Sequence, residues 1–498
     1  MQGNLGAIDI GILLAYCCAV VGMGIYYERK SRTAEQFMVA GRTIPAWAAG
    51  LAVMSTYTSS ISYIATPGKA FDSDWHPIIF SLCIFPVAWL TCRYAVSYYR
   101  KTMLISVYSF LEDRLGAWGR AYAALAFVLY MIGRVAVILY LVGLLLSTFV
   151  PWVPWSIGTV IIVVGLVTIA YTLLGGMEAV IWTDVLQSVI MIVGIVCCAV
   201  SLSIDVFSGP NYLIRSAIEA NKFSLGSWDL SLSSRTVWVM IIYGITENLR
   251  SLLADQNYVQ KYCTVPTERD AKRSIWIAML IYIPLTAIFL YIGTTLFAFY
   301  SPGGTRLAEG ITKGDQVFPY FIATEVPTGL KGLIIAAIIA AAMSTVDSAL
   351  NSSATVLLLD FYKRYRNPNI GERASVLFLR LATAVWGLLG TGAALLMIRA
   401  RSALDVWWQI SGIFGGALLG LFLLAFLQIR LRLWQGLVSI GVSIAVISWG
   451  TFARDLPASW QWAQCNLEGI IVGAVGTAAM VAVACLLGLT NRTKAIPA

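Results

Sequence analysis

A run of small polar residues interrupts one of the most apolar parts of the chain. Residues 340–360 read AAAMSTVDSALNSSATVLLLD. On a helix, which turns about 100° per residue, the polar side chains of this stretch share one face. That face holds Ala341, Ser344, Asp347, Ser348, Asn351 and Thr355.

The carboxylate is the residue on this face that needs an explanation. Serines at such spacing fit close helix packing, but a carboxylate at the centre of a membrane helix costs about 3 kcal/mol on insertion scales. Carboxylate, hydroxyl and carbonyl oxygens are the ligands that hard cations prefer. The pattern therefore predicts a cation site, with helix packing alone as the alternative.

Two other apolar stretches carry polar interruptions. Residues 50–71 read GLAVMSTYTSSISYIATPGKAF, and their dense hydroxyls weaken helix propensity before Pro67 and Gly68, which we expect to end the span. Residues 241–260, IIYGITENLRSLLADQNYVQ, are interrupted by charged and amide side chains. A span that breaks inside a membrane frees backbone carbonyls, which an ion, a substrate or water must satisfy. We therefore expect two broken helices beside a binding site.

Two isolated charges lie in other apolar runs. Arg134 is central in VLYMIGRVAVILYL, and its bidentate fork suits a carboxylate, either on a substrate or on Glu247, Asp184 or Asp347. Asp184, in LLGGMEAVIWTDVLQSVIM, is either a helix-start carboxylate at a wet boundary or part of the same ion site.

The elements that position these residues must be membrane helices. Of the 498 residues, 59% are hydrophobic and 12% are charged, and the mean hydropathy is +0.79. About 13 apolar stretches are long enough to span a bilayer, taking roughly 20 residues as one span. They are 8–27, 46–67, 76–97, 121–150, 155–172, 180–204, 234–258, 274–299, 331–362, 374–398, 405–428, 433–452 and 466–489. The chain is predicted to be an all-α polytopic membrane protein with a single transmembrane domain over 1–498.

Basic residues in alternate loops set the expected orientation. One set of loops holds roughly 20 positive residues against about 10 in the other set, which indicates that it is cytoplasmic. Its members are Arg29, Lys30, Arg32, Arg42, Arg100, Lys101, Arg114, Arg120, Lys261, Arg269, Lys272, Arg273, Lys363, Arg364, Arg366, Arg373, Arg430, Arg432, Arg492 and Lys494. The N-terminus is then outside and the C-terminus cytoplasmic. The net charge of +9 is explained by topology, and no nucleic-acid partner is expected.

The chain resembles the sodium:solute symporter family. The resemblance is carried by GGMEAVIWTDVLQ, DQNYVQKYC and IIAAAMSTVDSALNSSATVLLLDFY, while SYIATPGKAFDSDWHPIIF and IGRVAVILYL look most like the bacterial sialic acid symporters. It implies a LeuT-type fold of inverted five-helix repeats in a bacterial inner membrane. The implied parts are a leading helix over 8–27, repeats over 46–204 and 234–428, and two C-terminal helices within 433–489.

The resemblance also implies a function. We expect sodium-coupled import of a small organic solute, most simply an acidic sugar such as sialic acid (N-acetylneuraminate). The alternatives are another sugar, sugar acid or carboxylate, or a non-transporting sensor of the same fold. We see neither a nucleophile–base pair nor a metal cluster in the sequence, so an enzyme is not expected. The expected partners are the solute, sodium and the lipid bilayer, and no oligomer is required.

Family positions map onto this chain residue by residue. The first sodium site would be formed by Ser55, Thr58, Ala341, Ser344 and Thr345. A second sodium site, if used, would be formed by Asp184, Ser344, Asp347 and Ser348. The coupling ion is thus one sodium or two. Asp347 stands where the sialic acid branch has serine, so its carboxylate either tightens the second site or pairs internally and leaves it empty.

The substrate positions depart from that branch at three places. The mapped residues are Arg134, Tyr57, Ser59, Ser62, Ser81 and Pro77. Tyr57 stands where the branch has threonine, Ser81 where it has glutamine and Pro77 where it has phenylalanine. Arg134 matches the arginine that holds the substrate carboxylate, and the three changes could direct the pocket toward another acidic sugar.

Overall fold

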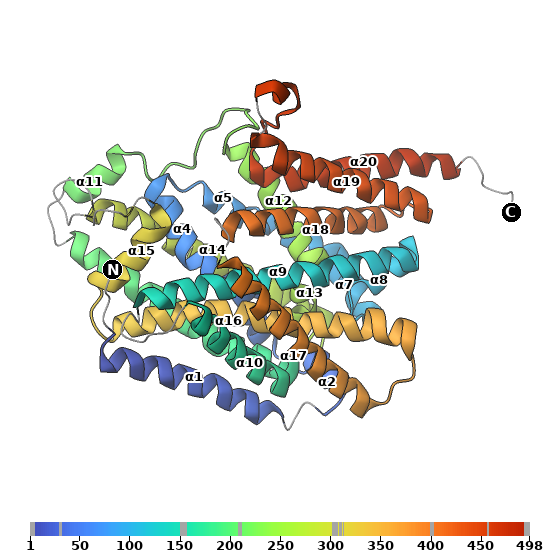
Figure 1. The fold of residues 1–498 in the computed structure, drawn as a ribbon, viewed down its shortest axis with the longest axis horizontal. Coiled ribbons are helices and arrows are strands. Elements are labelled where there is room, and N and C mark those ends of the chain that lie inside the picture. The colour runs from blue at the N-terminus through green and yellow to red at the C-terminus, as the bar shows by residue number, and fades with distance from the viewer. Residues whose placement is uncertain are drawn as a thin grey trace.

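The described part of the chain is a bundle of helices. The computed structural model describes residues 5–28, 32–149, 157–207, 212–300, 307, 311, 313–398, 403–455 and 458–492. Within these ranges, β-structure is limited to an isolated bridge between Ser227 and Thr236. In Figure 1, α1 (Ala7–Glu28) runs along one edge of the bundle, and α19 (Leu433–Phe452) and α20 (Val472–Arg492) run along the opposite edge. The expected all-α class is confirmed.

The other helices follow in chain order. They are α2 (Ala34–Val39), α3 (Ala46–Tyr57), α4 (Ser60–Asp72), α5 (Pro77–Leu82), α6 (Ile84–Leu90), α7 (Val96–Lys101), α8 (Ser109–Leu115), α9 (Ala117–Phe149), α10 (Ile157–Phe207), α11 (Tyr212–Glu219), α12 (Val237–Ala254), α13 (Gln256–Tyr262), α14 (Glu268–Phe299), α15 (Gly314–Thr324), α16 (Leu330–Val356), α17 (Glu372–Met397) and α18 (Ala403–Phe426). A π-helical segment, Leu357–Arg366, continues α16.

Every apolar range expected from the sequence contains helix, but the number of membrane crossings stays a prediction. By length and composition, nine helices of the described ranges can cross a membrane, or ten when the pair Ala34–Arg42 and Ala46–Tyr57, bent by 110°, counts as one span. Two shorter apolar helices are Ile157–Leu173 and Phe414–Phe426. The first of these is separated from the rest of α10 by a kink at Gly176 (φ 58°).

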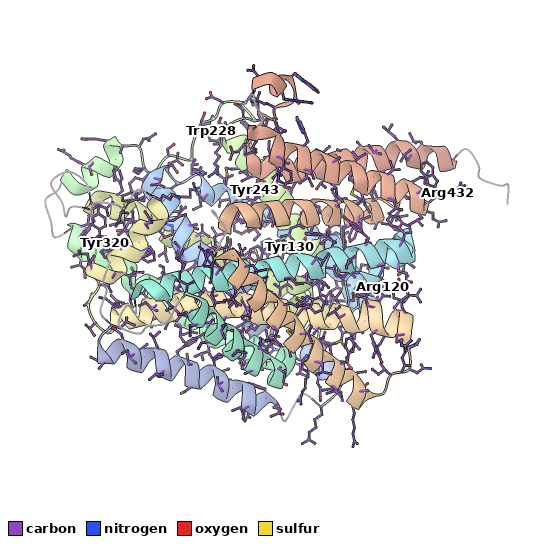
Figure 2. All side chains as sticks on the ribbon, viewed as in Figure 1. Arg120, Tyr130, Trp228, Tyr243, Tyr320 and Arg432 are labelled. Carbon is purple, nitrogen blue, oxygen red and sulfur yellow. The ribbon has the colours of Figure 1, made fainter. Side chains whose placement is uncertain are left out.

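The outer surface of the bundle is apolar. On α17, Leu377, Leu381, Leu388 and Leu396 are each more than half exposed. Exposed leucines in such number mark a surface that meets hydrocarbon, since water would drive it to aggregate. Side chains at the periphery include Trp228 and Arg432, whereas Tyr130 and Tyr243 lie within the bundle (Figure 2). The protein is therefore a multi-pass membrane protein.

The helix that carries the polar face lies at the centre of the bundle. α16 packs against α1, α3, α9, α10 and α17. In its most apolar window, 94% of the residues are buried inside the protein. The apolar side chains of α16 therefore pack against other helices, and its hydroxyls and carboxylate are held away from lipid.

Both expected helix breaks are present. Between α3 and α4, Thr58 and Ser59 have extended backbone, with ψ of 92° and 172°. Between α12 and α13, Asp255 is extended, with ψ of 111°. The two breaks lie near the starts of the expected repeats, 46–204 and 234–428. The repeat boundaries themselves stay a prediction.

The expectation that Pro67 and Gly68 end their span is wrong. Both lie inside α4, which continues to Asp72. Gly68 is needed for packing instead of termination, because a Cβ atom there would lie 2.6 Å from Oδ1 of Asp315 on α15. The missing side chain lets the two helices approach closely.

The first helix is tied to the start of the central one. Asp9 of α1 is fully buried, and its Oδ1 accepts hydrogen bonds from the backbone N–H groups of Gly329 and Gly332, both at 2.7 Å. Its Oδ2 accepts from the N–H of Gly6 at 2.9 Å. A carboxylate placed this way satisfies amides that the first turn of a helix leaves without partners.

Several residues used to orient the chain lie on helices, and one of them is fully buried. Lys261 lies on α13 and is fully buried, so counting it as a cytoplasmic loop charge is wrong. Arg29, Lys30 and Lys494 lie outside the described residues. The start of α1 and the end of α20 lie toward opposite ends of the bundle (Figure 1). Which end is cytoplasmic stays a prediction.

Candidate functional site

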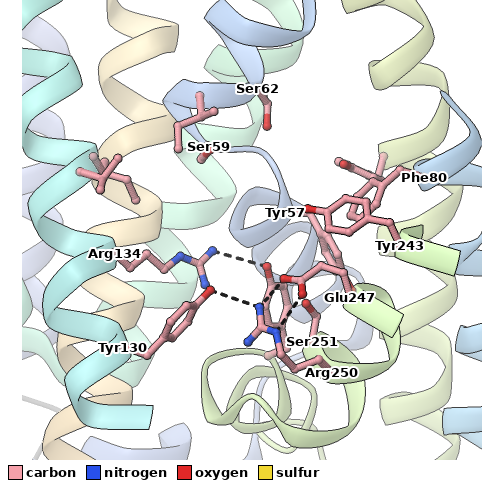
Figure 3. Close-up of a pocket in the computed structure, with 15 residues that line it drawn as sticks. Tyr57, Ser59, Ser62, Phe80, Tyr130, Arg134, Tyr243, Glu247, Arg250 and Ser251 are labelled. Carbon is pink, nitrogen blue, oxygen red and sulfur yellow. Dashed lines mark hydrogen bonds and ion pairs between the residues drawn. The ribbon is translucent and has the colours of Figure 1, made fainter. Parts of the chain in front are cut away.

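A cavity of about 200 Å³ lies beside the break between α3 and α4. Its walls come mainly from the broken helix, α9 and α12, with single residues from α5, α13 and α14. Figure 3 shows Arg134 and Tyr130 reaching from α9 toward Glu247 and Arg250 on α12, with Ser59 and Ser62 on the α4 side. The cavity thus collects two arginines and a carboxylate inside an apolar bundle.

Arg250 is saturated by carboxylates. Its guanidinium donates to Glu247 at 2.5 and 3.1 Å and to Oδ2 of Asp255 at 3.2 Å. It also donates to the hydroxyl of Tyr130 at 3.1 Å and lies 5.0 Å from the centre of that ring. Buried charges are stable only when they are paired in this way. Arg250 is therefore held in place by protein groups.

Arg134 is held more loosely. Its Nη2 donates to the carbonyl of Thr56 at 3.2 Å and to the hydroxyl of Tyr258 at 3.5 Å. Its Nη1 lies 4.0 Å from Oδ2 of Asp255, the oxygen that Arg250 already engages. The Thr56 carbonyl belongs to the last turn of α3, so Arg134 also caps that broken helix.

None of the three internal carboxylates given as alternative partners of Arg134 forms an ion pair with it. Glu247 pairs with Arg250, and Asp184 pairs with Lys261 at 2.7 Å. Asp347 accepts from Tyr171 at 2.8 Å. The carboxylate that lies within ion-pair distance of Arg134 is Asp255, which was not predicted as its partner.

The predicted substrate residues fall around two neighbouring cavities. Tyr57, Ser59, Ser62 and Arg134 line the first. A second cavity of about 220 Å³ is lined by Pro77 and Ser81 and shares Ser62 with the first. The two also share Ile61, Phe80, Tyr243 and Tyr282. All six predicted residues thus lie at one connected region, although their roles remain predictions.

Several lining residues were missed. Glu247 and Arg250 were visible as charges in an interrupted span, and their three-residue spacing places them on one helix face. Apart from Tyr57, which was predicted, the tyrosines of the cavity gave no such signal: Tyr130, Tyr243, Tyr258 and Tyr282. Tyr57 packs between Tyr258 and Tyr282, at ring-centre distances of 4.6 and 5.2 Å. Aromatic residues are common throughout this chain, so type alone did not mark them.

The residues predicted for the first sodium lie on α16 and at the break of the helix pair α3 and α4, which packs against it. Ser55 and Thr58 lie at the break and are fully buried. On α16, the hydroxyls of Ser344 and Thr345 donate to the carbonyl of Ala341 at 3.1 and 3.0 Å. Hydroxyl and carbonyl oxygens of this kind are suitable ligands for a hard cation. The donor set fits sodium, which Ser55, Thr58, Ala341, Ser344 and Thr345 would hold.

The residues predicted for a second sodium already have protein partners. Asp184 is fully buried, so its interpretation as a carboxylate at a wet boundary is wrong. Its Oδ2 holds Lys261. The single hydroxyl proton of Ser348 is shared between Oδ1 of Asp347 at 3.1 Å and the Ser344 carbonyl at 2.7 Å. The hydroxyl bonds within α16 leave oxygen lone pairs free for an ion, but the ammonium at Asp184 makes this set a poor fit for a sodium shared by both carboxylates. Among the described residues, no group of three or more His, Cys, Asp or Glu side chains forms a metal site.

Comparisons with known proteins agree on one family. The model of the sodium:solute symporter family matches residues 37–434. The sodium/sialic acid symporter SiaT of Proteus mirabilis (strain HI4320) is 31% identical over 491 residues, covering 98% of both chains. The sodium/sialic acid symporter NanT of Aliivibrio fischeri (strain ATCC 700601 / ES114) is 31% identical over 474 residues, covering 94% of this chain and 93% of that one.

A solved structure shares the arrangement of helices. It is a substrate-bound, outward-open state of a Na⁺-coupled sialic acid symporter, described as revealing a novel Na⁺ site. The two superpose with a TM-score of 0.87 at 30% identity, covering 97% of this chain and 98% of the other.

Proposed function

The chain belongs to the sodium:solute symporter family, and from that premise we propose that it imports sialic acid or a closely related acidic sugar. Sodium is the coupling ion of this family. The family consists of transporters, and the bilayer-facing helices match that role. We place the chain in a bacterial inner membrane, with the N-terminus outside and the C-terminus cytoplasmic.

The substrate proposal rests on how Arg134 is paired inside the protein. Its guanidinium lines the cavity, and the carboxylate that pairs with it lies at 4.0 Å and is already engaged by Arg250. A permanently charged fork of this kind binds a carboxylate in two parallel hydrogen bonds. A substrate carboxylate would give Arg134 a close partner of its own. Without it, Arg134 has only Asp255, which it shares with Arg250.

Cavity size supports a substrate larger than a simple carboxylate. Ligand pockets usually measure about 300–1,000 Å³. The cavities here measure about 200 and 220 Å³ and share walls. We propose that the substrate occupies both, with its carboxylate on Arg134 and its remaining hydroxyl and amide groups extending past Ser62 toward Ser81.

The broken helix explains how sodium and substrate are coupled. Ser55 and Thr58 offer oxygens to the ion, while Tyr57, Ser59 and Ser62 of the same segment line the cavity. Sodium bound at the break supplies a positive charge that orders this segment. An ordered segment presents its cavity-lining side chains in one arrangement, so substrate binds better with sodium present.

Uptake into proteoliposomes tests this function. We expect labelled N-acetylneuraminate to accumulate only with an inward sodium gradient, to saturate, and to be displaced by excess unlabelled acidic sugar but not by glucose. Uptake without sodium dependence would contradict the symporter function. Sodium-dependent uptake of another solute, with no competition by acidic sugars, would contradict the substrate. Binding of sialic acid without any flux would indicate a sensor.

A further inference from the structure

The buried lysine on α13 is surrounded by oxygens as a bound cation is. The Nζ atom of Lys261 lies 2.6 Å from Oγ1 of Thr56, 2.7 Å from Oδ2 of Asp184 and 3.0 Å from the carbonyl of Ala52. An ammonium group has three N–H donors, and these three oxygens satisfy them. Lys261, Asp184 and Thr56 are each at most 1% exposed. The charge is therefore fully enclosed.

Three helices build this enclosure. α3 contributes Ala52 and Thr56 just before its break, and α10 contributes Asp184. α13 begins immediately after the other break, at Asp255, and carries Lys261 inward. Ala52 is also the acceptor for the hydroxyls of Ser55 and Thr56, so oxygens are concentrated at this point of the bundle.

The remaining residues of the expected second sodium site also have hydrogen-bond partners within the protein. Asp347 uses one oxygen for Tyr171 and the other for Ser348. The hydroxyls of Ser344 and Ser348 donate to backbone carbonyls of α16. At Oδ2 of Asp184, a sodium would have to displace an ammonium that is covalently attached to the protein. Oδ1 has no hydrogen-bond partner among the described residues, but a sodium there would lie beside the same positive charge and be repelled by it.

We propose that the ammonium of Lys261 occupies the cation position at Asp184, so that this chain binds one sodium and not two. The inference rests on the proposed sodium-coupled transport, which it deepens by assigning the number of ions. The ammonium group of Lys261 is covalently attached, so it takes up no ion from solution and is not released with the substrate. One inward sodium with one singly charged anion then moves no net charge.

Counting bound sodium on the purified wild-type protein is the primary test. Equilibrium binding of radioactive sodium, without substrate, is expected to saturate at one ion per chain. Two ions per chain would overturn the inference while leaving the proposed function intact. No bound sodium would instead contradict the proposed function. The count needs no variant, so it does not depend on whether a mutant folds.

Variants at Lys261 then test the assignment to this residue. Lys261→Met keeps the length of the side chain and removes the charge, and is expected to raise the count to two. Adding Asp184→Asn to it should return the count to one, and Lys261→Arg should keep it at one. A folded Lys261→Met protein that still binds one sodium would overturn the assignment. If that variant does not fold, the wild-type charge-to-substrate ratio decides: zero for a monoanion supports the inference, and one positive charge overturns it.

Discussion

The Nη1 atom of Arg134 lies 4.0 Å from Oδ2 of Asp255, and the Nη1 atom of Arg250 lies 3.2 Å from the same oxygen. Two buried guanidinium groups therefore share one carboxylate unequally. Arg250 has Glu247 in addition, whereas Arg134 relies on a carbonyl and a tyrosine hydroxyl. We propose that this asymmetry reflects different roles, with Arg134 binding substrate and Arg250 holding the site together.

Arg134→Lys should weaken acidic-sugar binding at least tenfold, or about 1.4 kcal/mol, because lysine keeps the charge but loses the bidentate fork. Thermal-shift titration with N-acetylneuraminate measures this. Stabilisation by sodium alone should not change. Arg235→Lys, at an ion pair with Glu468 outside the cavity, is the matched control. Normal sugar binding by the Arg134 variant would show that this arginine is only structural.

Arg250→Leu should lower protein stability more than Arg134→Leu does. Removing Arg250 leaves Glu247 and Asp255 without their closest cation, and breaking such a buried pair costs about 3–5 kcal/mol. Thermal unfolding in detergent, without ligand, compares the two variants. Adding Glu247→Gln to Arg250→Leu should recover part of the loss. Equal midpoints for both single variants would contradict the division of roles.

Ser344→Ala and Thr345→Ala should each raise the sodium concentration for half-maximal uptake by roughly tenfold, which corresponds to about 1.4 kcal/mol. Each removes one oxygen from the predicted first sodium site. Thr383→Ala on α17 is the control, because its hydroxyl makes the same type of bond, to the carbonyl of Leu379 at 2.9 Å, away from the site. Unchanged sodium dependence in both α16 variants, at equal expression, would exclude the site.

Ser81→Leu should reduce binding of N-acetylneuraminate while leaving binding of a short monocarboxylate, such as lactate, unchanged. The larger side chain fills the second cavity without touching Arg134. Competition binding with both ligands measures the difference. Unchanged binding of the sugar would mean that the substrate is confined to the first cavity.

Gly293→Ala should destabilise the protein, because the added Cβ would lie 2.1 Å from the carbonyl oxygen of Pro67 and force α14 away from α4. Overpacking of this kind typically costs about 1–3 kcal/mol. Gly392→Ala is the control, since it meets nothing within 4 Å. The thermal midpoint should fall for Gly293→Ala and stay level or rise slightly for the control. An equal change in the thermal midpoint of both variants would show that helix propensity, not packing, determines the effect of the substitution.

Local patterns predicted the broken helices and the polar helix well. Dense hydroxyls at 50–71 and a carboxylate within 340–360 have few physical uses inside hydrocarbon, so their presence indicated both a break and burial. The stopping point at Pro67 was predicted wrongly, because proline in a membrane helix is tolerated when neighbouring helices satisfy the freed carbonyl. The local sequence does not reveal that neighbour.

Ion pairs between residues far apart in the sequence were the feature that the sequence predicted least well. Lys261 follows the polar stretch DQNYVQ, as a loop lysine would, and its partner Asp184 lies 77 residues earlier. Nothing near either residue distinguishes a buried ion pair from two boundary charges. The same holds for Arg134 and Asp255, whose relation depends on how α9 meets the second break.

The bond between Asp9 and the start of α16 has a consequence for how the protein is made. Gly329 lies 320 residues after Asp9. At about 5–20 residues per second, the ribosome needs roughly 16–64 s to deliver it. For that time the first helix stays in the membrane with its carboxylate unable to reach these amides. Assembly of the protein around α1 is therefore completed late in biosynthesis. We expect Asp9→Asn to have its larger effect on the rate at which mature protein appears in the membrane, and its smaller effect on the stability of the assembled protein.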